Sequence, residues 1–194
     1  GIAVGLDTVE KLLDANPDVV VIVDEAYVDF GAQSAVSLIG RHPNLLVVQT
    51  TSKSRALAGL RVGWAMGDEH LIAGLRCVRD CVNSYTVDRL AQAGAAAAVR
   101  DEPYFQLVRR RVMDTRERTA QALKEIGFTV LPSQANFLFV RHPDRPGKAL
   151  FDGLRERGVL VRRWDTPEIR EWLRVSIGTD ADMAALIDAL KKLQ

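Results

Sequence analysis

The chain has few of the residues that mark secreted, metal-binding or membrane proteins. It contains two cysteines and three histidines in 194 residues, too few and too scattered for a disulfide framework or a zinc site. No apolar run reaches the roughly 18 residues of a membrane-spanning helix, and no signal-peptide pattern opens the sequence. These absences favour a reduced, cytoplasmic setting with no metal and no membrane partner.

The chain also has little net charge. Its 26 Lys and Arg residues almost balance 25 Asp and Glu residues, leaving +1, so no nucleic-acid partner is expected. A basic cluster at residues 109–111, with Arg116 and Arg118, is interspersed with acidic residues and is typical of a solvated helix face. A nucleic-acid binder that uses this helix is the alternative, and its binding would depend strongly on salt.

Three apolar runs in the first half of the chain predict strands of one sheet. Helical patterns accompany them: Asp7 and Glu10 are spaced as in a capping box before a first helix, and residues 68–100 have helical periodicity. Buried strands with helices near them indicate an α/β architecture with a partial, mostly parallel sheet. The predicted strands are residues 18–23, 44–49 and 61–66.

The last third of the chain has shorter elements. A long helix is expected over residues 104–126, with Gly127 as its C-cap. Short apolar runs then alternate with helical patterns, which is typical of a compact α+β unit. We therefore expect two domains, residues 1–100 and residues 101–194. The short runs are residues 128–131, 136–140, 159–163 and 172–177, and the helical patterns lie near residues 148–156 and 181–193.

Polar side chains follow the predicted strands where ligands bind in open α/β sheets, at the carboxyl ends. Hydroxyl groups and a guanidinium suit a phosphate, and a lysine beside an anion site suits a cofactor held as a Schiff base. Pyridoxal 5'-phosphate (PLP) needs these groups and an acid at its ring nitrogen. The candidates are Asp24, Tyr27, Thr50, Ser52, Lys53 and Arg61.

Each of these residues alone has an ordinary structural explanation. Lys53 is typical of a surface lysine, Arg61 of a salt-bridge partner and Tyr27 of a core tyrosine. Their order along the chain carries more information than any one of them. Residues 24–27 (DEAY) and residues 51–64 (TSKSRALAGLRVGW) together resemble the fold-type I, PLP-dependent aminotransferases, and most closely the histidinol-phosphate aminotransferases.

The resemblance extends over essentially the whole chain and implies a role for each candidate. Lys53 would hold the cofactor and move the proton between the substrate α-carbon and the cofactor. Asp24 would pair with the pyridinium nitrogen and Tyr27 with the phenolic oxygen. The phosphate group would contact Thr50, Ser52 and Arg61. Further matching stretches are residues 83–87 (NSYTV), 132–137 (PSQANF) and 173–179 (LRVSIGT).

Two arginines in the last third match substrate-binding positions of that family. Arg174, in residues 173–179, matches the arginine that binds the substrate carboxylate. Arg162, at the end of residues 158–162 (GVLVR), matches one that helps to hold the substrate phosphate. Without the resemblance, both would be strand-end arginines with a structural role.

The resemblance implies amino transfer between L-histidinol phosphate and 2-oxoglutarate, in histidine biosynthesis. An aromatic amino acid aminotransferase or a threonine-phosphate decarboxylase would share nearly all of these motifs, and Arg162 favours a phosphorylated substrate. A non-catalytic remnant that lost the cofactor is the alternative from another class.

Family members are longer at the N-terminus, and Gly1 matches the last residue of their Asn-Pro-x-x-Pro-Thr-Gly turn. The resemblance therefore implies the C-terminal part of such a transferase, with residues 1–100 from its large PLP-binding domain and residues 101–194 as its small C-terminal domain. The family's shared active site implies a homodimer. We expect these 194 residues alone to bind PLP poorly.

Overall fold

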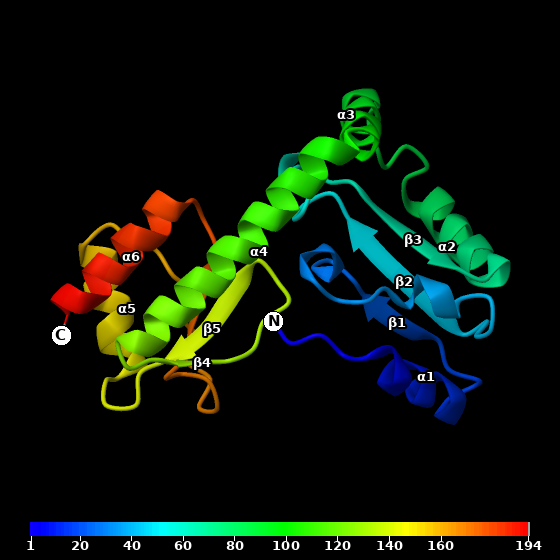
Figure 1. Cartoon of the computed structure of the whole chain (residues 1–194). Coiled ribbons are helices and arrows are strands. Elements are labelled where there is room, and N and C mark those ends of the chain that lie inside the picture. Colours follow the sequence, from blue (N-terminus) through cyan, green and yellow to red (C-terminus); the bar gives the residue numbers. More distant parts are fainter. Residues whose placement is uncertain (194) are drawn as a thin grey trace. The chain divides into compact units, whose positions relative to one another are not determined.

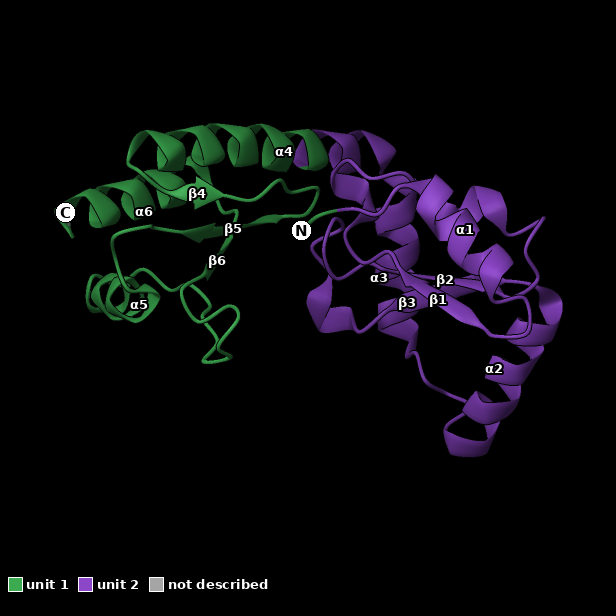
Figure 2. Ribbon diagram, turned by 90° about the horizontal axis from the view of Figure 1, so that it is seen from below, with its two compact units in different colours: residues 1–2, 109–194 green, residues 3–108 purple. Residues whose placement is uncertain are grey.

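A computed structural model describes residues 1–193 and divides the chain into two compact units (Figure 2). One unit is Ala3–Val108, and the other comprises Arg109 onward with Gly1–Ile2. The break falls inside helix α4 (Glu102–Glu125), later than the expected boundary after residue 100. The first turns of α4 belong with the preceding residues because Phe105 is buried there under the Arg55 guanidinium, 3.6 Å from the ring centroid.

The unit of residues 3–108 is built on a three-stranded sheet in the order β1-β2-β3 (Figure 1). β1 (Val21–Asp24) is parallel to β2 (Leu45–Thr50), whereas β3 (Gly63–Gly67) is antiparallel to β2. The expectation of a mostly parallel sheet therefore holds for β1 and β2 and fails for β3. Residues 51–62 contain only the 3-10 turn η3 (Ala58–Leu60), so no crossover helix returns the chain to a parallel start.

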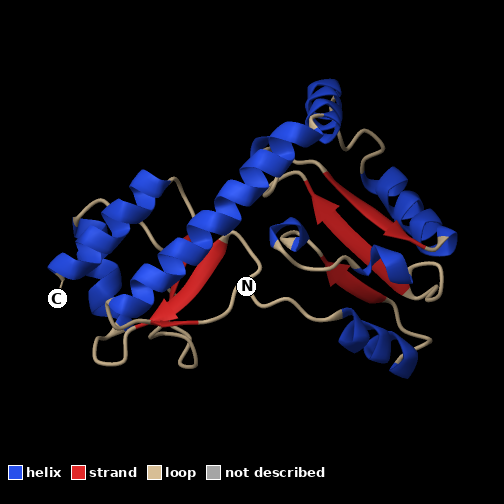
Figure 3. Ribbon diagram, viewed as in Figure 1, coloured by secondary structure: helices blue, strands red, loops and turns tan. Residues whose placement is uncertain are grey.

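Helices flank this sheet (Figure 3). The capping box expected at Asp7 is absent, because α1 begins at Leu6 after Gly5 and has no side-chain cap. The helical stretch expected over residues 68–100 is two helices, each opened by an aspartate that accepts a backbone hydrogen bond. The elements are α1 (Leu6–Ala15), η1 (Val28–Phe30), η2 (Ala35–Leu38), α2 (Glu69–Val82) and α3 (Arg89–Arg100).

One face of this sheet packs on α1 and η2. Side chains of β2 meet Val9 and Leu13 of α1 and Leu38 of η2 in a buried cluster. The opposite side of β1 is open, since Ile22 is 63% exposed. The expectation of a buried first strand therefore holds for one face of β1 only within residues 1–193, where alternate residues of β1 face α1 and η2.

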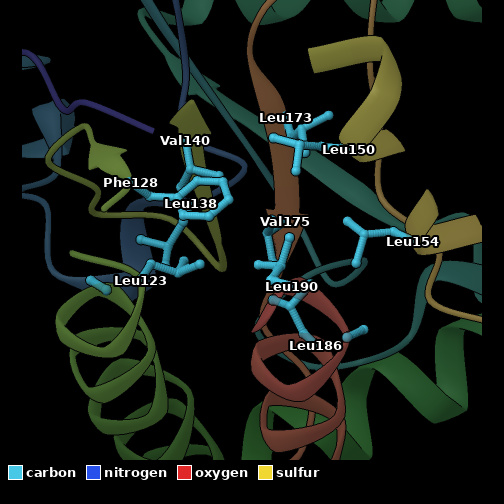
Figure 4. Packing of buried hydrophobic residues seen from close by; sticks show 12 residues of the cluster. Leu123, Phe128, Leu138, Val140, Leu150, Leu154, Leu173, Val175, Leu186 and Leu190 are labelled. Carbon is cyan, nitrogen blue, oxygen red and sulfur yellow. The ribbon is translucent and has the colours of Figure 1, made fainter. Parts of the chain in front are cut away.

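The unit that begins at Arg109, green in Figure 2, packs three helices on an antiparallel sheet in the order β4-β5-β6. Alternate residues of β5 and β6, such as Leu138 and Val175, enter the core with Leu123 of α4 (Figure 4). The run at residues 159–163 forms no strand here, only an isolated bridge from Arg162 to Arg174. The elements are β4 (Thr129–Val130), β5 (Phe137–Arg141), α5 (Gly147–Glu156), β6 (Leu173–Ser176) and α6 (Asp180–Lys192).

Two helix ends in this unit have well-defined stop or start signals. Gly127 follows α4 with φ of +86°, as expected for its C-cap role. Thr179 and Asp182 form a capping box at the start of α6. Within residues 1–193, no helix has the length and apolar character to cross a membrane, and no group of three His, Cys, Asp or Glu gathers as a metal site.

Candidate active site

The six predicted cofactor residues lie at one edge of the β1-β2-β3 sheet. β1 and β2 are parallel, with Asp24 paired to Val48, so both strands end at the same edge. β3 is antiparallel, and its first residue, Gly63, pairs with Thr50. The start of β3 therefore returns to the edge where β2 ends. The order and direction of the three strands therefore bring the end of β1 and the lysine loop (residues 51–62, which includes Arg61) to this edge.

Gly63 lets the two strands approach closely at that edge. A Cβ atom at this position would lie 2.9 Å from the Gln49 carbonyl oxygen, closer than carbon and oxygen atoms tolerate. The backbone of β2 cannot yield without disturbing the ladder that ends at Thr50. A glycine is therefore needed to hold the lysine loop against the end of β2.

Asp24 is an exposed carboxylate on the open side of β1. Its Oδ1 accepts a hydrogen bond from the Ala26 amide at 2.9 Å, which fixes the side chain at the strand end. Within residues 1–193, Oδ2 accepts none. A carboxylate with one oxygen fixed by the backbone and the other accessible can pair with a protonated ring nitrogen.

Lys53 lies next to Tyr27. The Nζ atom is 5.4 Å from the centroid of the Tyr27 ring, within the range of a cation–π contact. Lys53 is exposed, and no ion pair holds its amine within the described residues 1–193. This amine is therefore free to form a covalent bond with a carbonyl ligand, with the phenol ring beside it.

Hydroxyl groups converge just before Lys53. Thr50 Oγ1 donates to Ser52 Oγ at 2.9 Å and also lies 3.1 Å from the Val62 carbonyl oxygen. The Ser52 amide donates to Thr50 Oγ1 at 3.0 Å. Both hydroxyls are half-buried. Two neighbouring hydroxyls that can rotate toward a ligand suit an anionic oxygen.

Arg61 has a left-handed backbone, with φ of +55°. This conformation is uncommon for a residue other than glycine and is concentrated at functional sites and tight turns. The guanidinium Nη1 donates to the Ala58 carbonyl oxygen at 2.7 Å, which leaves other donors of this exposed group for an anion. Ala56, in the same loop, has the same φ of +55°.

Sequence reasoning missed three residues that hold the lysine loop and the end of β1. Glu25 is only 6% exposed and accepts hydrogen bonds from Ser34, Ala35 and Gln49. Asp29 accepts a hydrogen bond from the buried Ser54 hydroxyl, next to Lys53. For Glu25 a signal existed, because strand alternation turns it to the covered side when Asp24 faces outward.

Arg55 is the third of these residues. Its Nη1 donates to the Ala98 carbonyl oxygen at 2.6 Å, and its guanidinium covers the Phe105 ring. These partners lie far along the chain, so no local pattern indicates them. Arg55 therefore fixes the lysine loop to α3 and the start of α4.

The two predicted substrate arginines lie in the other unit, close to each other. Arg162 and Arg174 exchange backbone hydrogen bonds of 3.0 and 2.8 Å, and both guanidinium groups lie near the Trp164 ring. Neither forms an ion pair within residues 1–193, and the buried Nε of Arg174 has no hydrogen-bond partner there. The structure thus brings six candidates together in one unit and two in the other.

Comparison with known proteins gives similar chains over the full length. Histidinol-phosphate aminotransferase 1 of Bordetella parapertussis is 56% identical over 193 residues, which is 100% of this chain and 54% of that protein. The histidinol-phosphate aminotransferase of Gluconacetobacter diazotrophicus is 55% identical over 98% of this chain and 53% of that protein. The chain thus spans about half the length of the curated relatives it matches.

A solved structure agrees with these relatives. The histidinol-phosphate aminotransferase of Sinorhizobium meliloti, in complex with pyridoxal 5'-phosphate, matches with a TM-score of 0.83 and 25% identity over 95% of this chain and 52% of that one. The shared fold confirms the expected α/β aminotransferase architecture. The expected placement of the chain in the C-terminal part of such a transferase stays a prediction. A model of the family "aminotransferase class I and II" matches residues 1–190, and the chain belongs to that family.

Proposed function

We propose that this chain serves a PLP-dependent aminotransferase that moves an amino group between L-histidinol phosphate and 2-oxoglutarate, in histidine biosynthesis. The observation that carries the proposal is the gathering of an amine, a carboxylate, a phenol, two hydroxyls and a guanidinium at one sheet edge. Curated relatives at 55–56% identity bear the name of this enzyme.

The residues at the edge fit PLP in charge and donor type. Asp24 would hold the positive charge of the ring nitrogen, and the Tyr27 hydroxyl would donate to the ring oxygen. Thr50, Ser52 and Arg61 would hold the phosphate. The fit is supported by the accessible oxygen of Asp24 and by the neighbouring hydroxyls, 2.9 Å apart.

PLP, when bound, supplies an aldehyde for a lysine amine and an electron-withdrawing ring beside the substrate α-carbon. Lys53 would hold it, and the Lys53 amine, once released by the amino donor, would take the proton from the substrate α-carbon and return it at the cofactor carbon. The Tyr27 ring, 5.4 Å from the Lys53 Nζ atom, supports this role because it lies beside the amine. Asp24 keeps the ring nitrogen protonated because a carboxylate favours the charged form of a neighbouring base.

Arg162 and Arg174 would bind the anionic part of the substrate. Their guanidinium groups have no ion-pair partner within residues 1–193 and can give forked hydrogen bonds to a phosphate or carboxylate. A phosphate dianion can use both groups, whereas a carboxylate is satisfied by one fork. This favours a phosphorylated donor over an aromatic amino acid, and it does not separate histidinol phosphate from threonine phosphate.

We further propose that the enzyme is a cytoplasmic homodimer. Large apolar side chains are exposed on and just after α2, including Val78 at 64% and Val82 at 83%, and such side chains are typical of an interface. The exposed, unpaired thiols of Cys77 and Cys81 suit a reducing compartment.

Substitution of Arg162 tests the substrate. In the PLP-loaded, full-length protein, Arg162→Met should lower kcat/KM for L-histidinol phosphate by about 10- to 100-fold, because a charge-assisted hydrogen-bond pair is lost. The value for L-phenylalanine should change little. Arg157→Gln is the matched control, at an exposed arginine whose guanidinium donates to the Gly153 carbonyl oxygen at 3.0 Å. Preference for L-phenylalanine in the unmodified enzyme would contradict the proposed donor, and release of carbon dioxide from threonine phosphate would identify a decarboxylase.

A further inference from the structure

A row of aromatic rings and arginines covers the side of the β5-β6 sheet that faces away from its core. Leu138 and Val140 enter the core, so Phe139 and its neighbours at alternate positions lie on the other side. Trp172 stacks on Phe139 with ring centroids 5.0 Å apart, and Trp164 meets the same ring edge-on at 6.3 Å. This row is not part of the buried cluster of the unit.

Trp164 differs from the other rings because it contacts two cations. The Arg162 guanidinium carbon lies 5.5 Å from its centroid, and the Arg174 carbon lies 5.6 Å from it. Trp172 contacts one arginine, Arg141, at 5.1 Å. All of these distances are within the range over which the negative face of an aromatic ring attracts a cation.

The two cations at Trp164 are held together without an acid. The bridge between Arg162 and Arg174 fixes their backbones side by side, and like charges at such a spacing repel each other. The nearby acids are engaged elsewhere: Asp165 pairs with Arg163 at 2.5 Å, and Glu171 accepts from the Gly147 amide at 2.6 Å. The Phe137 ring also lies 5.4 Å from the Arg174 guanidinium carbon, but within residues 1–193 Trp164 is the ring that contacts both cations and so offsets their repulsion.

We propose that Trp164 is a positioning residue that holds Arg162 and Arg174 together as a receptor for one phosphate dianion. The proposal rests on the proposed function and deepens it, because it makes Trp164 a determinant of preference for a phosphorylated amino donor. The ring leaves the forks of both guanidinium groups unpaired by protein acids, so the dianion supplies the missing negative charge. Its apolar surface also limits water beside that charge pair, which strengthens the attraction.

Matched tryptophan variants test this role in the full-length, PLP-loaded enzyme. Trp164→Leu should raise KM for L-histidinol phosphate about tenfold, while Trp164→Phe, which keeps a ring, should raise it about threefold or less. KM for 2-oxoglutarate should rise less, and kcat should stay within about twofold, because no reacting atom is touched. Trp172→Leu, which removes a ring of the same row from Arg141, should leave both KM values unchanged.

A binding measurement separates failure of this role from failure of the proposed function. Calorimetric titration with inorganic phosphate needs no turnover, and Trp164→Leu should weaken phosphate binding about tenfold relative to Trp172→Leu. If no amino donor reacts but this difference appears, the substrate assignment fails and the role of Trp164 stands. Equal phosphate affinity in the two leucine variants, or a phenylalanine variant as weak as Trp164→Leu, would overturn the proposal.

Discussion

Glu25 is a buried acid held by three donors. Ser34 Oγ and Gln49 Nε2 each donate at 2.7 Å, and the Ala35 amide donates at 2.6 Å. Glu25→Ala would leave the buried Ala35 amide and the half-buried Ser34 and Gln49 side chains without their acceptor. We expect the free energy of unfolding to fall by about 3 kcal/mol, measured by urea denaturation.

The matched control for Glu25 is an exposed acid in the same unit. Asp80 pairs with Arg79 at 2.7 Å, with both side chains about half exposed. Asp80→Ala should change stability by less than about 1 kcal/mol, because exposed ion pairs contribute little. Equal losses in the two variants would contradict the role assigned to Glu25.

At the residue scale, the sequence predicts residues whose side chains suit the cofactor, and it misses residues that hold the lysine loop in place. Lys53 and Asp24 are predicted as site residues because their types and order suit a cofactor, and the structure places both at one sheet edge. Arg55 has no such signal, since its value comes from the Ala98 carbonyl and the Phe105 ring. Contacts between distant parts of a chain depend on the fold and leave no local pattern.

At the scale of elements, the start of α6 links stability to pH. Hydrogen bonds from the Thr179 hydroxyl and backbone amide lower the pKa of Asp182 below the usual aspartate value. A carboxylate whose pKa is lowered by folding stabilises the fold at pH values above its pKa in the unfolded chain, which is about 3.9. This stabilisation is lost as the pH falls through the pKa of the folded state. The protein should therefore become less stable as pH falls below about 4.

Asp182→Asn tests that link. The variant should unfold at lower urea concentration than the unmodified protein at pH 5, and the difference should narrow at about pH 3, where the carboxylate is protonated. Thr179→Ser keeps the hydroxyl and should retain the pH dependence. A difference that is constant between the two pH values would contradict the assignment.

Two glycines, one just after a helix and one inside a helix, should respond to alanine in opposite directions. Gly127 has φ of +86°, and a Cβ there would lie 3.0 Å from His142 Nε2, so Gly127→Ala should lower the free energy of unfolding by about 1–2 kcal/mol. Gly74, inside α2, has open space around it, so Gly74→Ala should raise it by about 0.5–1 kcal/mol. Thermal or urea unfolding measures both, and a loss of stability in both variants would contradict this reading of the backbone.

Element types were predicted more accurately than their edges and pairing. The long helix α4, and the helices α5 and α6, follow from clear apolar periodicity and from Gly127. The antiparallel direction of β3 was not predicted, because the sequence of a strand does not indicate whether it pairs with its neighbour in parallel or antiparallel. The break at residues 83–88 was missed because both flanking segments have helical periodicity, and only Asp88, the N-cap of α3, marks the restart.

For the whole molecule, the sequence predicted two parts but not the point of division. The expected boundary followed a change in composition, whereas the structural one lies within a continuous helix. Composition does not indicate that the first turns of α4 pack in one unit and its later turns in the other. The chain also spans about half of its curated relatives, so the assignments to a large PLP-binding domain and a small C-terminal domain stay predictions.

The central claim is that Lys53 carries the cofactor, and reduction with borohydride tests it most directly. The full-length protein and the 194-residue chain would each be mixed with PLP, reduced and mapped by peptide mass, with Lys53→Arg as the matched control. We predict a visible absorption band and a label on Lys53 in the full-length protein, and neither in the control. A label on another lysine, or no label in the full-length protein, would contradict the account.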